Sequence, residues 1–234
     1  MKPLSACFES LLDDDDEFYD PENDKKAIED WIKDNYHING ELTISDDLVV
    51  DCNNTVKVKN KSITSLTNGL FRWGKINKSF YCSGCNNLKS LDDAPKEVSR
   101  SFWCDNCKNL KSLEGAPKKV SGTFWCEHCD NLTSLKGAPE EVGEDFNCSD
   151  CENLTSLEGA PKKVRKCFYC NNCSKLMSLK GAPEEVGEDF VCSECENLTS
   201  LECSPKKVGR DFDCSVCPNL KISDSDRKKY KIVN

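Results

Sequence analysis

The sequence predicts a repeat solenoid with a parallel β-sheet on its concave face, an irregular convex side built of turns, and a small α-helical N-terminal cap. Three observations lead to this prediction. A pair of cysteines recurs every 22 residues, a Phe stands two residues before each pair, and Leu, Pro and Val follow at constant spacings. Periods of about 20 to 50 residues are typical of solenoids, because no unit can bury its apolar side chains without a stacked neighbour.

The repeat unit reads F-x-C-x-x-C-x-x-L-x-x-L-x-x-x-P-x-x-V-x-x-x. Phe and the first cysteine are two residues apart, the period of a strand, so both are expected to point into the core. Proline fixes φ and cannot donate to a β-ladder, so the Gly-Ala-Pro corner indicates a turn. The first cysteines are Cys82, Cys104, Cys126, Cys148, Cys170, Cys192 and Cys214. The second cysteines are Cys85, Cys107, Cys129, Cys151, Cys173, Cys195 and Cys217.

Charged side chains alternate in sign from one unit to the next. Equivalent positions on neighbouring coils are about 4.8 Å apart, so opposite charges are expected to form ladders that disfavour a slip by one repeat. The two residues after Pro read, in successive units, Lys118-Lys119, Glu140-Glu141, Lys162-Lys163, Glu184-Glu185 and Lys206-Lys207.

The segments outside the repeat are interpreted as caps. A helix is expected over residues 23–36, because Ile28 and Ile32 share one face. Residues 42–44 and 48–52 are expected to be early capping strands, and residues 224–231 a short closing helix. The four segments are an acidic flexible tail (1–21), an N-terminal cap with degenerate coils (22–79), a seven-repeat solenoid (80–222) and a C-terminal cap (223–234).

The unit V-x-x-x-F-x-C-x-x-C-x-x-L resembles the leucine-rich repeat, with the second cysteine at the position of its Asn or Cys. The unit also resembles the repeats of leucine-rich-repeat proteins of bacteriophages and large DNA viruses, which often read F-x-C-S-x-N-x-L-T-S-L-x-G-A-P. This chain departs from that form in having a second cysteine where Asn is commoner. The similarity covers roughly residues 25–222. It implies the solenoid fold and a viral origin, and it implies no particular activity.

The paired cysteines leave three interpretations open. Consecutive units read C-x2-C-x18-C-x2-C, which is within the spacing of zinc sites with four thiolate ligands. Against zinc, the first cysteine alternates in phase with a core Phe, and seven pairs leave one pair over. We therefore expect buried structural thiols and neither metal nor cofactor, with zinc sites and disulfide staples as the alternatives.

A column of aromatic residues between Phe and the first cysteine is the predicted binding surface. It contains Tyr81, Trp103, Trp125 and Tyr169, and Asp105 and Glu127 form a polar, acidic rim beside it. Exposed Trp and Tyr are enriched at binding hot spots, and an apolar stripe with a polar rim is typical of protein interfaces. The alternative is that the aromatic rings only stack and stabilise the sheet. The acidic rim argues against nucleic acid.

Composition and motifs favour a non-enzymatic function. The net charge of -9 is concentrated in residues 1–50, and no catalytic triad, phosphate loop or paired-carboxylate constellation is visible. No membrane-length apolar run or signal peptide is visible, so a cytoplasmic location is expected. We expect a scaffold that docks a host or viral protein, with possible roles in counter-defence or host takeover. A virion-associated spacer and a zinc-organised array are the alternative functions.

Overall fold

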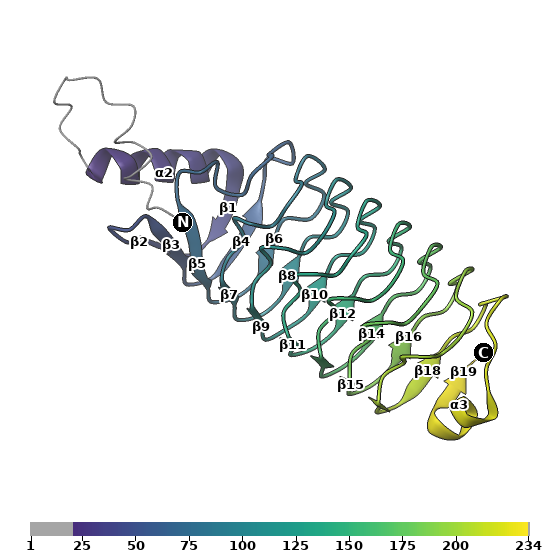
Figure 1. Ribbon diagram of the computed structural model, residues 1–234. Coiled ribbons are helices and arrows are strands. Elements are labelled where there is room, and N and C mark those ends of the chain that lie inside the picture. Colours follow the sequence, from purple (N-terminus) through teal and green to yellow (C-terminus); the bar gives the residue numbers. More distant parts are fainter. Residues whose placement is uncertain (1–20, 234) are drawn as a thin grey trace.

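The computed structural model describes residues 21–233, and in it the predicted solenoid is confirmed. Coils of 22 residues stack side by side along one axis, with a helix at the N-terminal end (Figure 1). Each coil places one short strand in each of two β-sheets, and the apolar side chains lie between the sheets. Within the described range, no helix has the length and apolar character needed to cross a membrane.

Sheet A has ten strands and contains the Phe of every unit. Its strands pair in exact register with the units, so that Phe124 lies beside Phe102 and Phe146. In order across the sheet, the strands are β1 (Tyr36–Asn39), β4 (Thr55–Val58), β6 (Phe80–Tyr81), β8 (Phe102–Trp103), β10 (Phe124–Trp125), β12 (Phe146–Asn147), β14 (Phe168–Tyr169), β16 (Phe190–Val191), β18 (Asp211–Asp213) and β19 (Lys231–Val233).

Sheet B has nine strands and occupies the side for which the sequence predicts irregular turns. In each repeat its strand is only two residues long. In β9, β11 and β13, for example, the Val is buried and the preceding Lys or Glu faces solvent. In order, the strands are β2 (Leu42–Ile44), β3 (Val49–Cys52), β5 (Arg72–Ile76), β7 (Glu97–Val98), β9 (Lys119–Val120), β11 (Glu141–Val142), β13 (Lys163–Val164), β15 (Glu185–Val186) and β17 (Lys207–Val208).

A continuous ladder of Phe rings runs through the core. From Phe80 to Phe212, each ring stacks on the next with centroids 4.9–5.7 Å apart. Every ring in this ladder is fully buried, as are the repeat leucines that pack beside it up to Leu198. Because each ring needs a ring on both sides, the ladder requires a cap at each end of the solenoid.

The N-terminal cap covers the first ring of this ladder. Helix α2 (Pro21–Asn35) buries Ile28 and Ile32 against the core. The rings of Tyr36 and Trp73 contact Phe80, with centroids 6.2 and 5.8 Å away. At this end β1 pairs antiparallel with β4 and β2 antiparallel with β3, so the parallel stacking stops here.

The C-terminal cap consists of helix α3 (Asp224–Lys229) and β19. Ser223 caps the helix in a capping box with Asp226. The Tyr230 ring then lies 4.6 Å from the Phe212 ring and ends the Phe ladder. The acidic tail that the sequence predicts lies outside the described residues, apart from Pro21 at the start of α2.

Candidate functional site

The predicted aromatic column lies on the outer face of sheet A. Strand register places Tyr81 beside Trp103, and Trp103 beside Trp125. The register also shows that the column is longer than the repeat alone indicates. In order, it reads His37, Lys57, Tyr81, Trp103, Trp125, Asn147, Tyr169, Val191, Asp213 and Val233.

Three of the four predicted aromatic residues form one contiguous patch, here called the aromatic ribbon (Tyr81, Trp103 and Trp125). The Trp103 and Trp125 rings have centroids 4.1 Å apart and an interplanar angle of 45°. The Tyr81 ring lies 5.6 Å from that of Trp103. All three side chains are half-buried, so each offers part of its ring to solvent. The rings therefore stabilise the sheet and present an apolar surface at the same time.

Both tryptophans of the ribbon have an unsatisfied hydrogen-bond donor. The Nε1 atoms of Trp103 and Trp125 are buried and have no acceptor among the described residues. A buried donor without a partner costs about 1–3 kcal/mol. Such a cost is unusual in native proteins and calls for an explanation, and a bound partner that supplies oxygen acceptors is one.

Tyr169 is not part of this patch. Asn147 stands between Trp125 and Tyr169 in the column and is itself buried. Tyr169 pairs with the Cys167 thiol, and this hydrogen bond, together with burial, raises the pKa of its hydroxyl. The fourth aromatic residue therefore lies on the same face but at a separate position.

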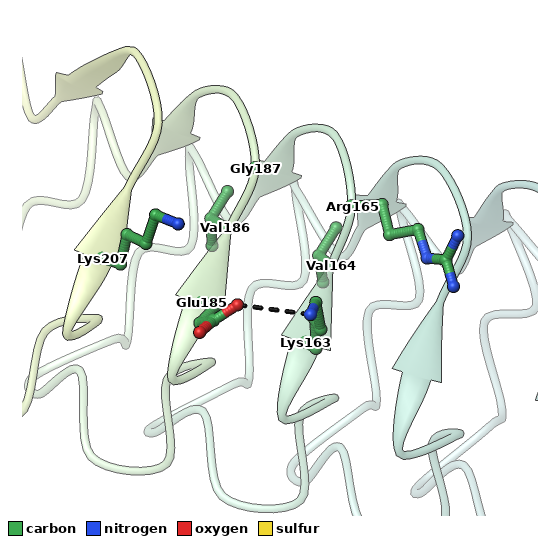
Figure 2. A pocket seen from close by; sticks show the side chains of 7 residues that line it. All are labelled: Lys163, Val164, Arg165, Glu185, Val186, Gly187 and Lys207. Carbon is green, nitrogen blue, oxygen red and sulfur yellow. Dashed lines mark ion pairs between the residues drawn. The ribbon is translucent and has the colours of Figure 1, made fainter.

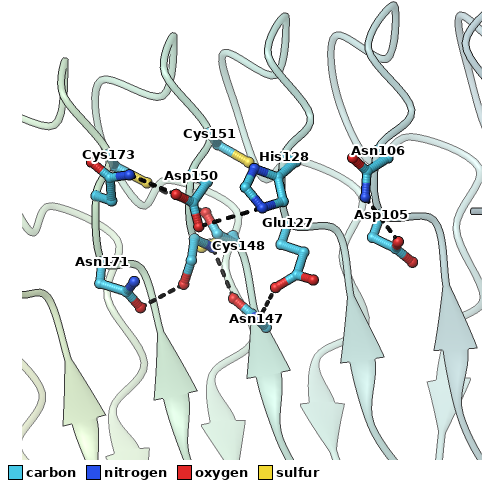
Figure 3. Close-up of polar contacts among 12 residues, drawn as sticks. Asp105, Asn106, Glu127, His128, Asn147, Cys148, Asp150, Cys151, Asn171 and Cys173 are labelled. Carbon is cyan, nitrogen blue, oxygen red and sulfur yellow. Dashed lines mark hydrogen bonds and ion pairs between the residues drawn. The ribbon is translucent and has the colours of Figure 1, made fainter. Parts of the chain in front are cut away.

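The acidic rim of the ribbon is ordered by hydrogen bonds within the face. The Glu127 carboxylate accepts a hydrogen bond from Asn147 Nδ2 at 2.7 Å, and Asp105 accepts one from Ser83. On the neighbouring turns His128 lies 3.9 Å from Asp150, and Asn106 donates to Asp105 (Figure 3). Both predicted rim carboxylates thus lie beside the ribbon, and hydrogen bonds within the face hold each of them in place.

A second acidic column on this face has a structural role that the sequence does not reveal. Asp145 and Asp189 accept backbone N–H groups of the next coil, from Cys167 and Asp211. Ser79 does the same for Ser101 in the N-terminal half. These side chains complete the strand pairing, and they make the C-terminal half of the face acidic.

The paired cysteines form ladders of hydrogen-bonded thiols. In six successive coils, the second thiol donates to the carbonyl oxygen of the first cysteine one coil earlier, at 3.2–3.3 Å. Burial raises the pKa of the Cys126, Cys148 and Cys170 thiols well above the ordinary value of 9.0. Each cysteine of the described chain is a free thiol. Over residues 21–233, no three His, Cys, Asp or Glu side chains converge as metal ligands would.

The outer face of sheet B has a shallow hollow of about 430 Å³ (Figure 2). It lies over Gly187, where a Cβ atom would be 1.9 Å from the Arg165 carbonyl oxygen. Lys163 and Glu185 form an ion pair of 3.4 Å across it, as the predicted charge ladder requires. The hollow exists because Gly187 has no side chain and the charged side chains of the ladder surround it. Among the residues that line it, no buried polar group points to a ligand.

Comparison of the chain with models of protein families, with curated proteins and with solved structures finds no match. The candidate site therefore stands on its own geometry.

Proposed function

We propose that this protein is a non-enzymatic scaffold that binds another protein through the aromatic ribbon. The observation that carries the proposal is the contact between Trp103 and Trp125, two half-exposed tryptophans whose buried indole N–H groups have no acceptor. Half-exposed Trp and Tyr side chains on a rigid sheet are the side chains most often found at interface hot spots.

The rim and the ribbon together define the chemistry of the partner. The ribbon fits apolar side chains, and the carboxylates of Asp105 and Glu127 fit basic groups at the edge of the contact. Carbonyl oxygens of a bound chain could accept from the two indoles after the rings turn. We therefore expect the partner to present a segment with apolar residues flanked by Lys or Arg.

The experiment compares three forms of the full-length chain as bait in extracts of the cells that express it. The forms are the wild type, Trp103→Ser with Trp125→Ser, and Met177→Thr. Met177 is the control because it is an exposed apolar residue, 58% accessible, at a position where other units have Thr or Lys. A specific partner is captured by wild type and control, and binds the double variant about 10- to 100-fold more weakly. Equal capture by the folded double variant contradicts the proposal.

The viral origin extends this proposal and rests on the resemblance described above, and a role in counter-defence or host takeover would follow from that origin. The cytoplasmic location stays an expectation from the sequence. A structural spacer is the second candidate function, and the incompletely covered last coil described below favours it. Co-purification with virus particles supports the spacer, and absence from particles contradicts it.

A further inference from the structure

The last coil has an apolar surface that the C-terminal cap leaves uncovered. Its residues, here called the end facet, surround a hollow of about 320 Å³ and are Cys214, Val216, Cys217, Pro218, Leu220 and Ile222. In the preceding coil the equivalents Cys195 and Leu198 are fully buried, whereas Cys217 and Leu220 are only half-buried. The cap protects the Phe ladder through Tyr230 and leaves this half of the coil open.

Val216 is the most unusual residue of the facet. It has a left-handed backbone with φ 56° and is 73% accessible. This conformation costs a β-branched residue about 1–2 kcal/mol. Other coils have a glycine or a polar residue here, namely Gly84, Asn106, His128, Asp150, Asn172 and Glu194. Val216 is exposed and strained, and it lies on the last coil, where the described residues place only the C-terminal cap and no further repeat. This combination indicates a contact made by another chain.

The chain around the facet is basic. Lys221 stands between Leu220 and Ile222, and α3 ends with three exposed basic residues, Arg227, Lys228 and Lys229. Residues 221–231 contain five basic and two acidic side chains. An occupant of the facet should therefore combine apolar side chains with negative charge.

Residues 8–19 of this protein have that combination. Phe8, Leu11 and Leu12 precede five consecutive acidic residues, 13–17, and Phe18 and Tyr19 follow them. We propose that the end facet binds residues 8–19 of a second copy of the chain. The inference is independent of the aromatic ribbon.

Chain length favours the second copy over the same molecule. Asp13 is eight residues before Pro21, so it can lie at most about 29 Å from the start of α2. The nine strands of sheet B, about 4.8 Å apart, separate the two ends of the solenoid by roughly 38 Å. The acidic run therefore cannot reach the facet of its own chain, and the contact is head to tail. A head-to-tail contact produces open chains or closed rings.

The experiment measures the mass of the full-length protein by analytical ultracentrifugation from low to high micromolar concentration. The facet variant is Val216→Asp. An interior coil has Asp150 at the equivalent position, so this change is expected to keep the fold. The tail variant replaces Asp13, Asp14, Asp15 and Asp16 with Asn and Glu17 with Gln. Met177→Thr is the control for an exposed apolar residue elsewhere.

Wild type and control are expected to assemble with rising concentration, and each single-site variant is expected to remain monomeric. An equimolar mixture of the facet and tail variants is the decisive sample. It contains one intact facet and one intact tail, so it should form dimers and nothing larger. A wild type that stays monomeric, a tail variant that still assembles, or a mixture that stays monomeric while the wild type assembles overturns the proposal.

Discussion

The Cys129 thiol donates a hydrogen bond to the backbone carbonyl oxygen of Cys104, one coil earlier, at 3.3 Å. The same bond recurs in six successive coils, so the second cysteine of each pair from Cys107 to Cys217 acts as a donor to the end of the preceding strand. A cysteine pair at zinc-like spacing can therefore be explained without a metal. One thiol donates a hydrogen bond to a backbone carbonyl group, and both side chains pack in the apolar core.

Replacing Cys129 with Ala should destabilise the fold. The change leaves the Cys104 carbonyl without this donor in a dry core and opens a small cavity, for a cost of about 1–3 kcal/mol. Urea denaturation measures the free energy of unfolding. Cys129→Ser restores a donor and is the control, so it should be less destabilising than Ala. The reverse order would show that the thiol contributes only volume.

Stability should fall as the pH rises above about 9. Burial raises the pKa of Cys195 to about 12, and that of Cys214 to about 11, from 9.0. The unfolded chain thus loses these protons at lower pH than the folded chain does. Between its unfolded and folded pKa values, each thiol then lowers the free energy of unfolding by up to about 1.4 kcal/mol per pH unit. Urea denaturation between pH 8 and 11 measures this loss, and a constant midpoint would contradict it.

Replacing Cys203 with Gly should stabilise the protein. Cys203 has φ 63° at the corner where other units have glycine, for example Gly137 with φ 99°. Relief of the left-handed strain should contribute about 1 kcal/mol. The matched variant Gly137→Ala should do the opposite, because its Cβ would lie 2.3 Å from the Leu113 carbonyl oxygen. Thermal melts compare both with wild type, and destabilisation by Cys203→Gly would contradict the account.

Reversing one charge of the sheet B ladder should be destabilising and sensitive to salt. Glu185 lies between Lys163 and Lys207 in the strand register. Glu185→Lys places three like charges in a row, at a cost below about 1 kcal/mol, because these side chains are exposed. Melting curves at low salt and at about 1 M salt give the test, since salt should remove most of the difference. Glu185→Gln is the control for loss of charge without reversal.

The sequence predicts the solenoid well because every unit repeats the same buried positions. Phe, the first cysteine and the first Leu of the unit recur without exception, so their burial and the stacking of coils follow from the period alone. The second sheet is harder to predict, because its strands contain a single inward residue such as Val120 and show no alternation. The predicted helix over residues 23–36 differs from α2 by one or two residues at each end.

The candidate site is predicted only in part. The outward position of Tyr81, Trp103 and Trp125 follows from strand alternation. Tyr169 is separated from the ribbon because the buried Asn147 lies between it and Trp125. The lack of acceptors for the two indole N–H groups results from the way the rings pack. Neither feature can be read from the spacing of residues in the sequence. The exposed end facet follows from where the C-terminal cap folds back, and that depends on the contact of Tyr230 with Phe212.

The most direct test of the thiol ladder is to measure zinc content and free thiols on freshly purified, full-length protein. Elemental analysis gives the metal, and thiol titration under denaturant gives the reactive cysteines among the 18 in the sequence. The account predicts almost no metal, and all 18 thiols titrating without a chelator. About three zinc ions per chain, with thiols released only by a chelator, would contradict it and make the repeats metal-built modules.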